Sequence, residues 1–177
     1  MEYINTYPSP LGGITIASNG TELTGLWFDG QKYDKSTLSN QYKPKNLPVF
    51  EQTKQWLDIY FQGKNPPFTP PLSFLSTPFR QKVWQILKTI PYGQTMTYKQ
   101  IAEICINQKN PSKMSAQAVG GAVGHNPISI IIPCHRVVGT NGSLTGYAGG
   151  IKKKIALLKL EKTNMEQLFV PKEGTAL

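Results

Sequence analysis

The chain has 177 residues, of which 39% are hydrophobic and 16% charged, a composition typical of a globular protein with one ordinary or two small domains. It contains no run of roughly 20 apolar residues that would cross a bilayer and no signal peptide, so we expect a cytoplasmic protein (nuclear in a eukaryote) with no membrane partner. Its two cysteines and two histidines lack metal-ligand spacing, so we expect neither a structural zinc site nor another cofactor.

The positive charge is concentrated in the second part of the chain. Residues 1–75 hold six Lys or Arg and six Asp or Glu, whereas residues 76–177 hold 13 basic and four acidic residues, which accounts for the net charge of +9. This asymmetry predicts a polyanionic partner, with nucleic acid as the first candidate. Charge alone fits a solvated basic face equally well.

The first 30 residues alternate between apolar and polar in the manner of β-strands. The dipeptide Asn19-Gly20 is a strong signal for a hairpin with a two-residue turn. Residues 31–46 are polar and predict a loop. The spacing of apolar residues then predicts a helix from Val49 to Phe61.

A proline-rich segment follows this helix. The sequence GKNPPFTPP, residues 63–71, can neither continue a helix nor pair in a central strand. We interpret residues 63–75 as a linker that ends an N-terminal, β-rich supporting domain of residues 1–75. Residues 76–177 then form a second, mostly helical domain, and the predicted fold class is α+β.

Three helices are predicted after the linker. Thr77 followed by Pro78 is typical of a helix start, and this first helix ends before Pro91. A second helix begins near residue 97 and a third, rich in Ala and Gly, covers residues 115–123. The last two suit a helix-turn-helix that approaches DNA closely. On the pattern alone, a plain helical hairpin is the better interpretation.

A buried strand is predicted at Ile128–Ile132, and Pro133, Cys134 and His135 follow it. A lone cysteine is more often an inert buried side chain. Here the strand end, the adjacent imidazole and the basic surroundings favour the reactive thiolate instead. Cys105, next to apolar residues of the second helix, is assigned to packing.

The segment Pro133-Cys134-His135-Arg136-Val137 is preceded by Asn126-Pro127 and followed by Gly146-Tyr147-Ala148-Gly149-Gly150. This order resembles the O6-alkylguanine-DNA alkyltransferases, which are methylated-DNA–protein-cysteine methyltransferases. The resemblance covers residues 76–165 well. Residues 1–75 resemble the family only in size and in their layout of strands followed by a helix.

The resemblance implies a role for each polar residue of the site. Cys134 would be the alkyl acceptor, which attacks the carbon bonded to guanine O6. His135 would act as a base through a water, with Glu161 at the end of the last helix orienting its imidazole. Tyr98 would donate a hydrogen bond to O6, helped by the N–H of Ala148. Without the resemblance, each of these residues would be read as structural or solvated.

The resemblance also implies a pocket for the base. Tyr147 would stack near the base, Val123 would form an apolar wall, and the carbonyls of Cys134 and Val137 would accept its exocyclic amine. Asn126 would tie the helix-turn-helix to the strand that carries the cysteine. The complete set of predicted substrate-binding residues is Val123, Asn126, Val137, Tyr147, Ala148 and Gly149.

The predicted DNA contacts include a departure from the family. A family arginine fills the space of the flipped base, and Gln117 stands at that position, without the charge or the stacking plane of guanidinium. The segment between the two helices, residues 107–114, is also longer than usual. The predicted DNA-binding residues are Lys99, Lys113, Ala116, Gln117 and Arg136, with Lys109 as a further phosphate contact. Lys152, Lys153 and Lys154 are interpreted as a solvated helix face.

The predicted function is therefore DNA repair by a single, irreversible alkyl transfer to Cys134 after base flipping. The partner would be duplex DNA with O6-alkylguanine, O4-alkylthymine is a second candidate substrate, and the protein would act as a monomer. Three alternatives remain open: a lesion sensor without transfer, a helix-turn-helix regulator, and a Cys–His hydrolase.

Overall fold

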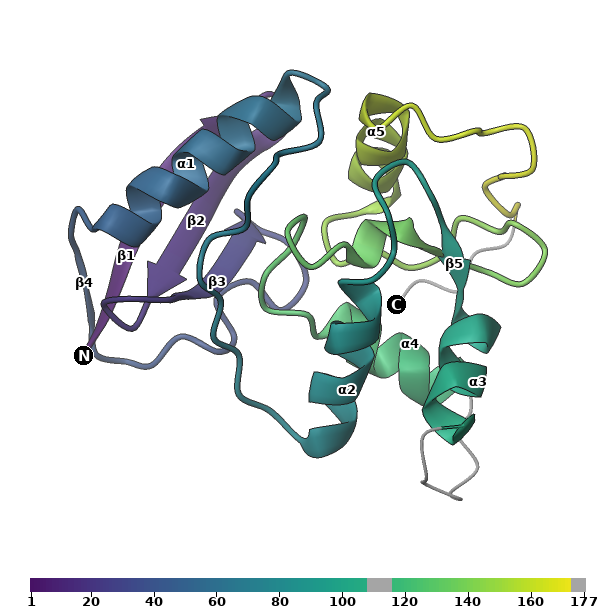
Figure 1. Ribbon diagram of the computed structural model, residues 1–177, viewed down its shortest axis with the longest axis horizontal. Helices are drawn as coiled ribbons and strands as arrows, with labels where there is room; N and C mark the ends of the chain where they lie inside the picture. Colours follow the sequence, from purple (N-terminus) through teal and green to yellow (C-terminus); the bar gives the residue numbers. More distant parts are fainter. Residues whose placement is uncertain (108–115, 173–177) are drawn as a thin grey trace. The chain divides into compact units, whose positions relative to one another are not determined.

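The computed structural model describes residues 1–107 and 116–172. The chain folds into two compact units (Figure 1). The first consists of residues 1–75 and 127–131, and the second of residues 76–126 and 132–177. The single division predicted after residue 75 does not account for the return of residues 127–131 to the first unit.

A four-stranded sheet forms the first unit, in the order β3-β2-β1-β4. Strand β1 (Glu2–Ser9) pairs antiparallel with β2 (Gly12–Ser18), which pairs antiparallel with β3 (Leu23–Phe28). The short strand β4 (Tyr42–Pro44) lies parallel to β1 at the edge. The prediction of a continuous loop over residues 31–46 was wrong at β4, because β1 supplies backbone partners that local sequence does not reveal.

The predicted hairpin is confirmed, but its loop is longer than two residues. Four residues, 19–22, connect β2 to β3. The side-chain oxygen of Asn19 accepts the N–H groups of Thr21 at 3.1 Å and Glu22 at 2.9 Å, an arrangement that Asn favours in turns. Gly20 has a φ of +118°, which glycine adopts without steric cost.

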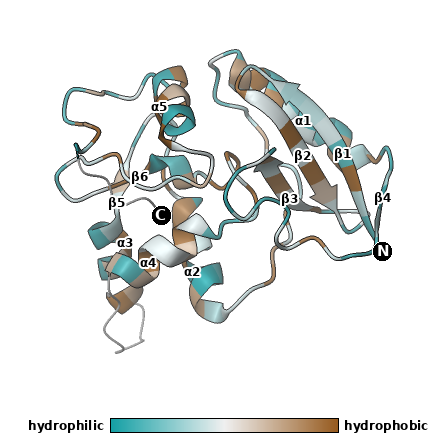
Figure 2. Cartoon of the chain, turned by 180° about the vertical axis from the view of Figure 1, so that it is seen from behind, coloured by the Kyte–Doolittle hydropathy of each residue, from teal (hydrophilic) through white to brown (hydrophobic). Residues whose placement is uncertain are grey.

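Helix α1 (Pro48–Phe61) covers the sheet (Figure 1). The helix predicted for residues 49–61 is thus confirmed, and it begins one residue earlier because proline suits a first helical turn. Figure 2 shows the hydrophobic character of β2 and β3. The core of this unit includes the fully buried side chains of Ile14, Ile16, Leu26, Phe50, Leu57 and Tyr60.

The second unit is mostly helical, so the α+β fold class is confirmed. Its helices are α2 (Pro78–Leu87), α3 (Tyr98–Asn107), α4 (Ala116–Gly124) and α5 (Ile151–Leu160). A 3-10 turn, η1 (Cys134–Arg136), leads into strand β6 (Val137–Val138). Strand β6 pairs in parallel with β5 (Met96–Thr97), which runs directly into α3.

Side-chain caps define where two of these helices begin. Thr77 accepts the N–H of Arg80 at 3.3 Å, as its position before Pro78 predicts. Thr97 and Gln100 form a reciprocal capping box: Gln100 N–H donates to the Thr97 hydroxyl at 3.0 Å, and Thr97 N–H donates to the Gln100 amide oxygen at 2.8 Å. Tyr98 is thereby held in the first turn of α3.

Helices α2, α3 and α4 contact one another. The indole N–H of Trp84 donates to the carbonyl of Ala122 at 2.8 Å, which joins α2 to α4 in the interior. Cys105 is fully buried in α3, in agreement with its assignment to packing. The connection between α3 and α4, with Lys109 and Lys113, lies outside the described residues.

The predicted strand at residues 128–132 does not form. The segment is buried, but it makes a single bridge to β3, between Ile128 and Leu26, and then turns. Ile130 has a φ of +70°, a left-handed conformation that costs a β-branched residue about 1–3 kcal/mol. The prediction was wrong because an apolar run indicates burial and does not distinguish a strand from a buried turn.

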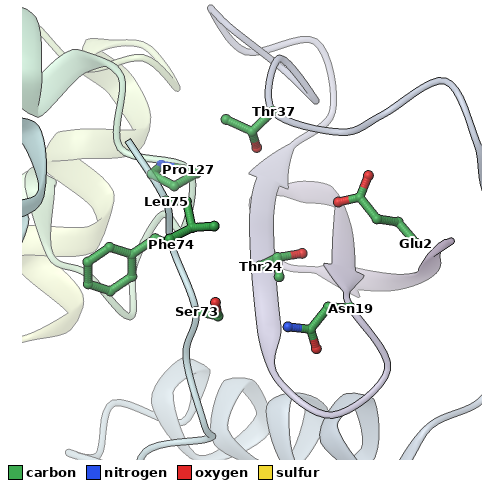
Figure 3. Close-up of a pocket in the computed structure, with 8 residues that line it drawn as sticks. All are labelled: Glu2, Asn19, Thr24, Thr37, Ser73, Phe74, Leu75 and Pro127. Atoms are coloured by element: carbon green, nitrogen blue, oxygen red, sulfur yellow. The ribbon is translucent and has the colours of Figure 1, made fainter. Parts of the chain in front are cut away.

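The first unit also contains a hollow of about 270 Å³ beside β3 (Figure 3). Its ionisable lining residue is Glu2, and the others are neutral: Asn19, Thr24, Thr37, Ser73, Phe74, Leu75 and Pro127. This lining supplies neither a thiol nor an imidazole. The hollow is therefore no candidate for the nucleophilic chemistry predicted from the sequence.

Candidate active site

Cys134 is the first residue of η1 and is 4% exposed. Its N–H donates to the carbonyl of Ile132 at 2.8 Å, which forms a tight turn around Pro133. Burial raises the pKa of the Cys134 thiol. A hydrogen bond from Asn126 and the charge of Lys154 oppose this effect, because both favour the thiolate.

Asn126 follows the C-terminus of α4 and is buried. Its amide donates to the carbonyl of Ile132 at 2.7 Å, and its side chain also hydrogen-bonds Cys134. This is the tie between the helix and the cysteine segment that the resemblance implies. The residue that Asn126 bonds, Ile132, lies in a turn and not in the predicted strand.

His135 and Glu161 form a buried pair. The Nε2 atom of His135 lies 2.5 Å from a carboxylate oxygen of Glu161, which caps the C-terminus of α5. Burial lowers the pKa of His135, although Glu161 opposes this shift. The imidazole is therefore neutral at pH 7. In the tautomer whose Nε2–H donates to Glu161, Nδ1 is the basic nitrogen.

Arg136 completes this buried charge cluster. Its Nε donates to Glu161 at 2.8 Å, and its Nη1 donates to the carbonyl of Ile90 at 2.7 Å. Burial raises the pKa of Glu161, but the hydrogen bonds of His135 and Arg136 and the charge of the guanidinium have the larger, opposite effect and hold the pKa below its usual range. The N–H of Gly93 also donates to Glu161, at 3.1 Å.

The expectation that Arg136 contacts a DNA phosphate is not supported by this geometry. Arg136 is 8% exposed, and its guanidinium is engaged by Glu161 and Ile90. The physical reason is that a buried carboxylate requires a compensating cation. The position of Arg136 next to Cys134 did not reveal its pairing with Glu161, since Glu161 is 25 residues away along the chain.

Two tyrosines lie near the thiol. Tyr98 donates its hydroxyl to the carbonyl of Thr145 at 3.1 Å. Burial, and then the charge of Cys134, raises the pKa of both Tyr98 and Tyr147, so both are neutral donors at pH 7. The ring of Tyr147 meets that of His135 edge to face, with centroids 6.5 Å apart. Among the described residues, nothing bonds the buried hydroxyl of Tyr147.

Lys154 differs most from its predicted place. The interpretation of residues 152–154 as a solvated face was wrong at Lys154, whose side chain is fully buried. Its ammonium donates to the carbonyls of Val137 at 2.5 Å and of Thr145 and Gly146 at 3.2 Å each. Burial lowers the pKa of Lys154 to about 8, although Cys134 opposes the shift. Because the lysine lies within a run of three, its spacing gave little warning.

The other predicted pocket residues are buried or half-buried. Val123 and Val137 are buried, and Ala148 and Gly149 are half-buried in the loop before α5. The carbonyl of Val137, which was expected to accept the guanine amine, accepts the Lys154 ammonium here. A carbonyl has two lone pairs, so the two roles are compatible.

The described residues predicted to contact DNA, other than Arg136, are exposed. Ala116 and Gln117 lie in the first turn of α4, and Lys99 lies in the first turn of α3. Lys113 is outside the described residues. Within residues 1–107 and 116–172, no helix is long and apolar enough to cross a membrane, and no group of three or more His, Cys, Asp or Glu is placed to hold a metal ion.

Both units match family models. The ribonuclease-like domain of 6-O-methylguanine DNA methyltransferase matches residues 3–74, and the DNA binding domain of the same family matches residues 78–163. The N-terminal unit, which resembled the family only in layout, is therefore also a family domain.

Relatives and solved structures agree with these matches. The methylated-DNA–protein-cysteine methyltransferase of Mycobacterium tuberculosis is 43% identical over 163 residues, 92% of this chain and 94% of the relative. The constitutive enzyme of that name from Bacillus subtilis is 38% identical over 170 residues, 94% of this chain and 99% of the relative. The crystal structure of Mycobacterium tuberculosis OGT in complex with DNA aligns with a TM-score of 0.79 at 42% identity, covering 90% of this chain and 92% of that one.

The fold of a β-rich unit joined to a mostly helical unit is thus shared with a solved structure of 42% identity. The chain belongs to the 6-O-methylguanine DNA methyltransferase family. This is a family of DNA repair methyltransferases with a DNA-binding domain.

Proposed function

We propose that this chain repairs duplex DNA by moving the alkyl group of O6-alkylguanine to the sulfur of Cys134, once per molecule. The observation that carries the proposal is the grouping of Cys134 with a neutral imidazole oriented by a carboxylate and with two neutral tyrosine hydroxyls. Membership of the methyltransferase family supports alkyl transfer as the reaction that these residues perform. O4-alkylthymine is a second candidate substrate with the same type of alkyl–oxygen bond.

Each step of the transfer has a residue of the site to perform it. The Cys134 proton passes through a water to Nδ1 of His135, because Glu161 engages Nε2. The thiolate attacks the alkyl carbon, so a carbon–sulfur bond forms and the bond to O6 breaks. The departing guanine keeps the electron pair and takes a proton from Tyr98. The proton on His135 then restores that hydroxyl through solvent, which leaves no net charge.

The product explains why each molecule acts once. Water does not displace the Cys134 thiolate from the alkyl carbon of the thioether. Among the described residues, no second nucleophilic thiol adjoins the site, since Cys105 is separately buried in α3. Regeneration would require breaking a stable carbon–sulfur bond. The protein therefore acts stoichiometrically.

The substrate must leave the base stack to reach the thiol. The alkylated atom lies inside the duplex, and rotating a nucleotide out costs a few kcal/mol. Exposed Gln117, in the first turn of α4, is placed by this proposal at the vacated space. We further propose that α3 and α4 act as a helix-turn-helix and that the protein works as a monomer in the cytoplasm.

The proposal is tested by the stoichiometry of dealkylation. Purified protein is incubated with excess duplex that contains one O6-methylguanine, and repaired guanine is measured over time. We expect a plateau at about one repaired base per chain and a methyl group on the peptide that contains Cys134. Cys134→Ser should abolish transfer and retain DNA affinity, and Cys105→Ser, as the matched control, should transfer normally.

Each contrary outcome points to a different class of protein. Tight binding of the lesion without a methylated peptide would indicate a sensor or a regulator. Multiple turnover, with ester or peptide hydrolysis, would indicate a Cys–His hydrolase. Substantial transfer by Cys134→Ser would mean that another residue is the acceptor.

A further inference from the structure

Lys154 is a buried cation for which the reaction described above has no role. It lies in the second turn of α5 and is fully buried. Its three partners are main-chain carbonyls, one from β6 and two from the loop that carries Tyr147. Burying an ammonium is costly unless its hydrogen bonds and its charge are compensated.

The carbonyls satisfy the hydrogen bonds of Lys154 but do not cancel its charge. Among the described residues, no Asp or Glu forms a salt bridge with it. The group whose negative charge stabilises the Lys154 ammonium is Cys134, and the lysine in turn stabilises the ionised thiol. A buried lysine without a carboxylate therefore has a potential anion in the acceptor sulfur.

The other charged groups around Cys134 are already paired or neutral. From η1, Arg136 is bound to Glu161, which caps α5, and His135 is neutral. From α3 and from the loop, Tyr98 and Tyr147 are protonated at pH 7. Within the part of the chain that the structure describes, Lys154 thus supplies a buried positive charge at this site that no carboxylate pairs with.

Lys154 also links the two sides of the pocket. The carbonyl of Thr145 accepts both the ammonium of Lys154 and the hydroxyl of Tyr98. The Val137 carbonyl, three residues after Cys134, accepts the same ammonium. One side chain therefore connects the cysteine segment, the loop and the proposed proton donor.

We propose that Lys154 is a positioning residue of the transfer site, which supplies the charge that favours the Cys134 thiolate and fixes the Thr145–Gly146 carbonyls beside it. The inference rests on the proposed function, in which Cys134 is the acceptor. Lys154 does not touch the alkyl group. It acts through the ionisation of the sulfur and through the placement of Tyr98.

The test is the pH dependence of thiol reactivity in Lys154→Met, a nearly isosteric neutral variant. Alkylation of Cys134 by iodoacetamide is followed from pH 5 to 11 in a Cys105→Ser background, so that one thiol reports. Without the cation, the pH of half-maximal reactivity should rise by about 1–2 pH units. DNA repair at pH 7 should slow by roughly 10- to 100-fold and recover towards alkaline pH. Lys152→Met, an exposed lysine of the same helix, is the matched control and should change neither profile.

A purely structural role would give a different result. It would slow repair at every pH and leave the thiol profile unchanged, and that outcome overturns the inference. Should Lys154→Met not fold, the reciprocal measurement uses Cys134→Ser and lysine NMR. Loss of the thiolate should lower the pKa of Lys154, since coupling between two sites is mutual, and an unchanged pKa overturns the inference. Thiol titration needs no DNA, so a wild-type protein that fails to repair DNA would contradict the proposed function and not this pairing.

Discussion

Glu161 holds two neighbours in different protonation states. It accepts hydrogen bonds from charged Arg136 and adjoins neutral His135, all within a buried cluster. Because the arginine is permanently charged, its pairing keeps Glu161 ionised, and the ionised carboxylate in turn selects the imidazole tautomer. The charge of one residue therefore determines which nitrogen of another is basic.

Replacing Glu161 should show both a stability effect and a pH effect. Glu161→Gln leaves Arg136 buried without an anion, so we expect a loss of about 3–5 kcal/mol in the free energy of unfolding at pH 7. The pKa of Glu161 is lower in the folded protein than in the unfolded chain. The contribution of ionised Glu161 to the free energy of unfolding is therefore fully present above about pH 4.5 and decreases as the pH falls further.

Urea denaturation of both proteins between pH 7 and pH 3 measures this effect. The difference in stability between wild type and Glu161→Gln should be constant down to about pH 4.5 and then shrink. Glu103→Gln, in which an exposed glutamate of α3 is changed, is the control and should remain close to wild type. A difference that grows on acidification would contradict the assigned charge states.

At the scale of elements, α4 combines a buried face with an exposed N-terminal turn. Val119, Ala122 and Val123 are buried, while Ala116 and Gln117 are exposed. Most residues of this helix are Ala or Gly, whose small side chains allow close packing on the buried face. The element thus combines a packed face with exposed Gln117, which is predicted to contact DNA.

Gln117→Arg should accelerate the repair of duplex DNA. A guanidinium adds charge and a stacking plane at the space that a flipped base leaves. We expect a several-fold gain on duplex substrate and little change on single strands, because single strands need no flipping. Single-turnover rates on matched duplex and single-stranded oligonucleotides measure the ratio. Equal gains on both would show that Gln117 has no part in flipping, and Gln81→Arg is a charge-matched control in α2.

At the scale of the whole molecule, positive charge and chemistry occupy the same part of the sequence. The net charge of +9 arises from residues 76–177, which also hold Cys134, whereas residues 1–75 are neutral overall. A polyanion is thus attracted by the part that acts on it. Two cations of this part, Arg136 and Lys154, are buried and belong to the site instead.

Affinity for undamaged duplex DNA should fall steeply with salt, because binding releases counterions from phosphates. Lys99→Gln, in the exposed first turn of α3, should lower the affinity and reduce the slope of log K against log salt by about one. Fluorescence anisotropy between 50 and 200 mM salt measures both quantities. Lys64→Gln, an exposed lysine of the neutral part, should leave the slope unchanged; an equal decrease for both variants would place the DNA elsewhere.

The elements that the sequence predicted well depend on short-range signals. The hairpin at Asn19-Gly20, the helix after residue 48 and the helix start at Thr77 each follow from residues within about four positions of one another. Strand β4 and the turn at Ile130 were missed, since pairing with β1 and with β3 involves distant parts of the chain.

The sequence by itself determined the α+β class and the family motif, because these depend on local pattern and on residue order, and the resemblance carried by that motif pointed to Cys134 as the proposed acceptor. Only the tertiary structure decided which charges are buried. Arg136 meets Glu161, 25 residues away, and Lys154 meets Val137, 17 residues away. The sequence around a Lys or Arg does not show whether its side chain is buried, because the groups that offset its positive charge are brought to it only by folding.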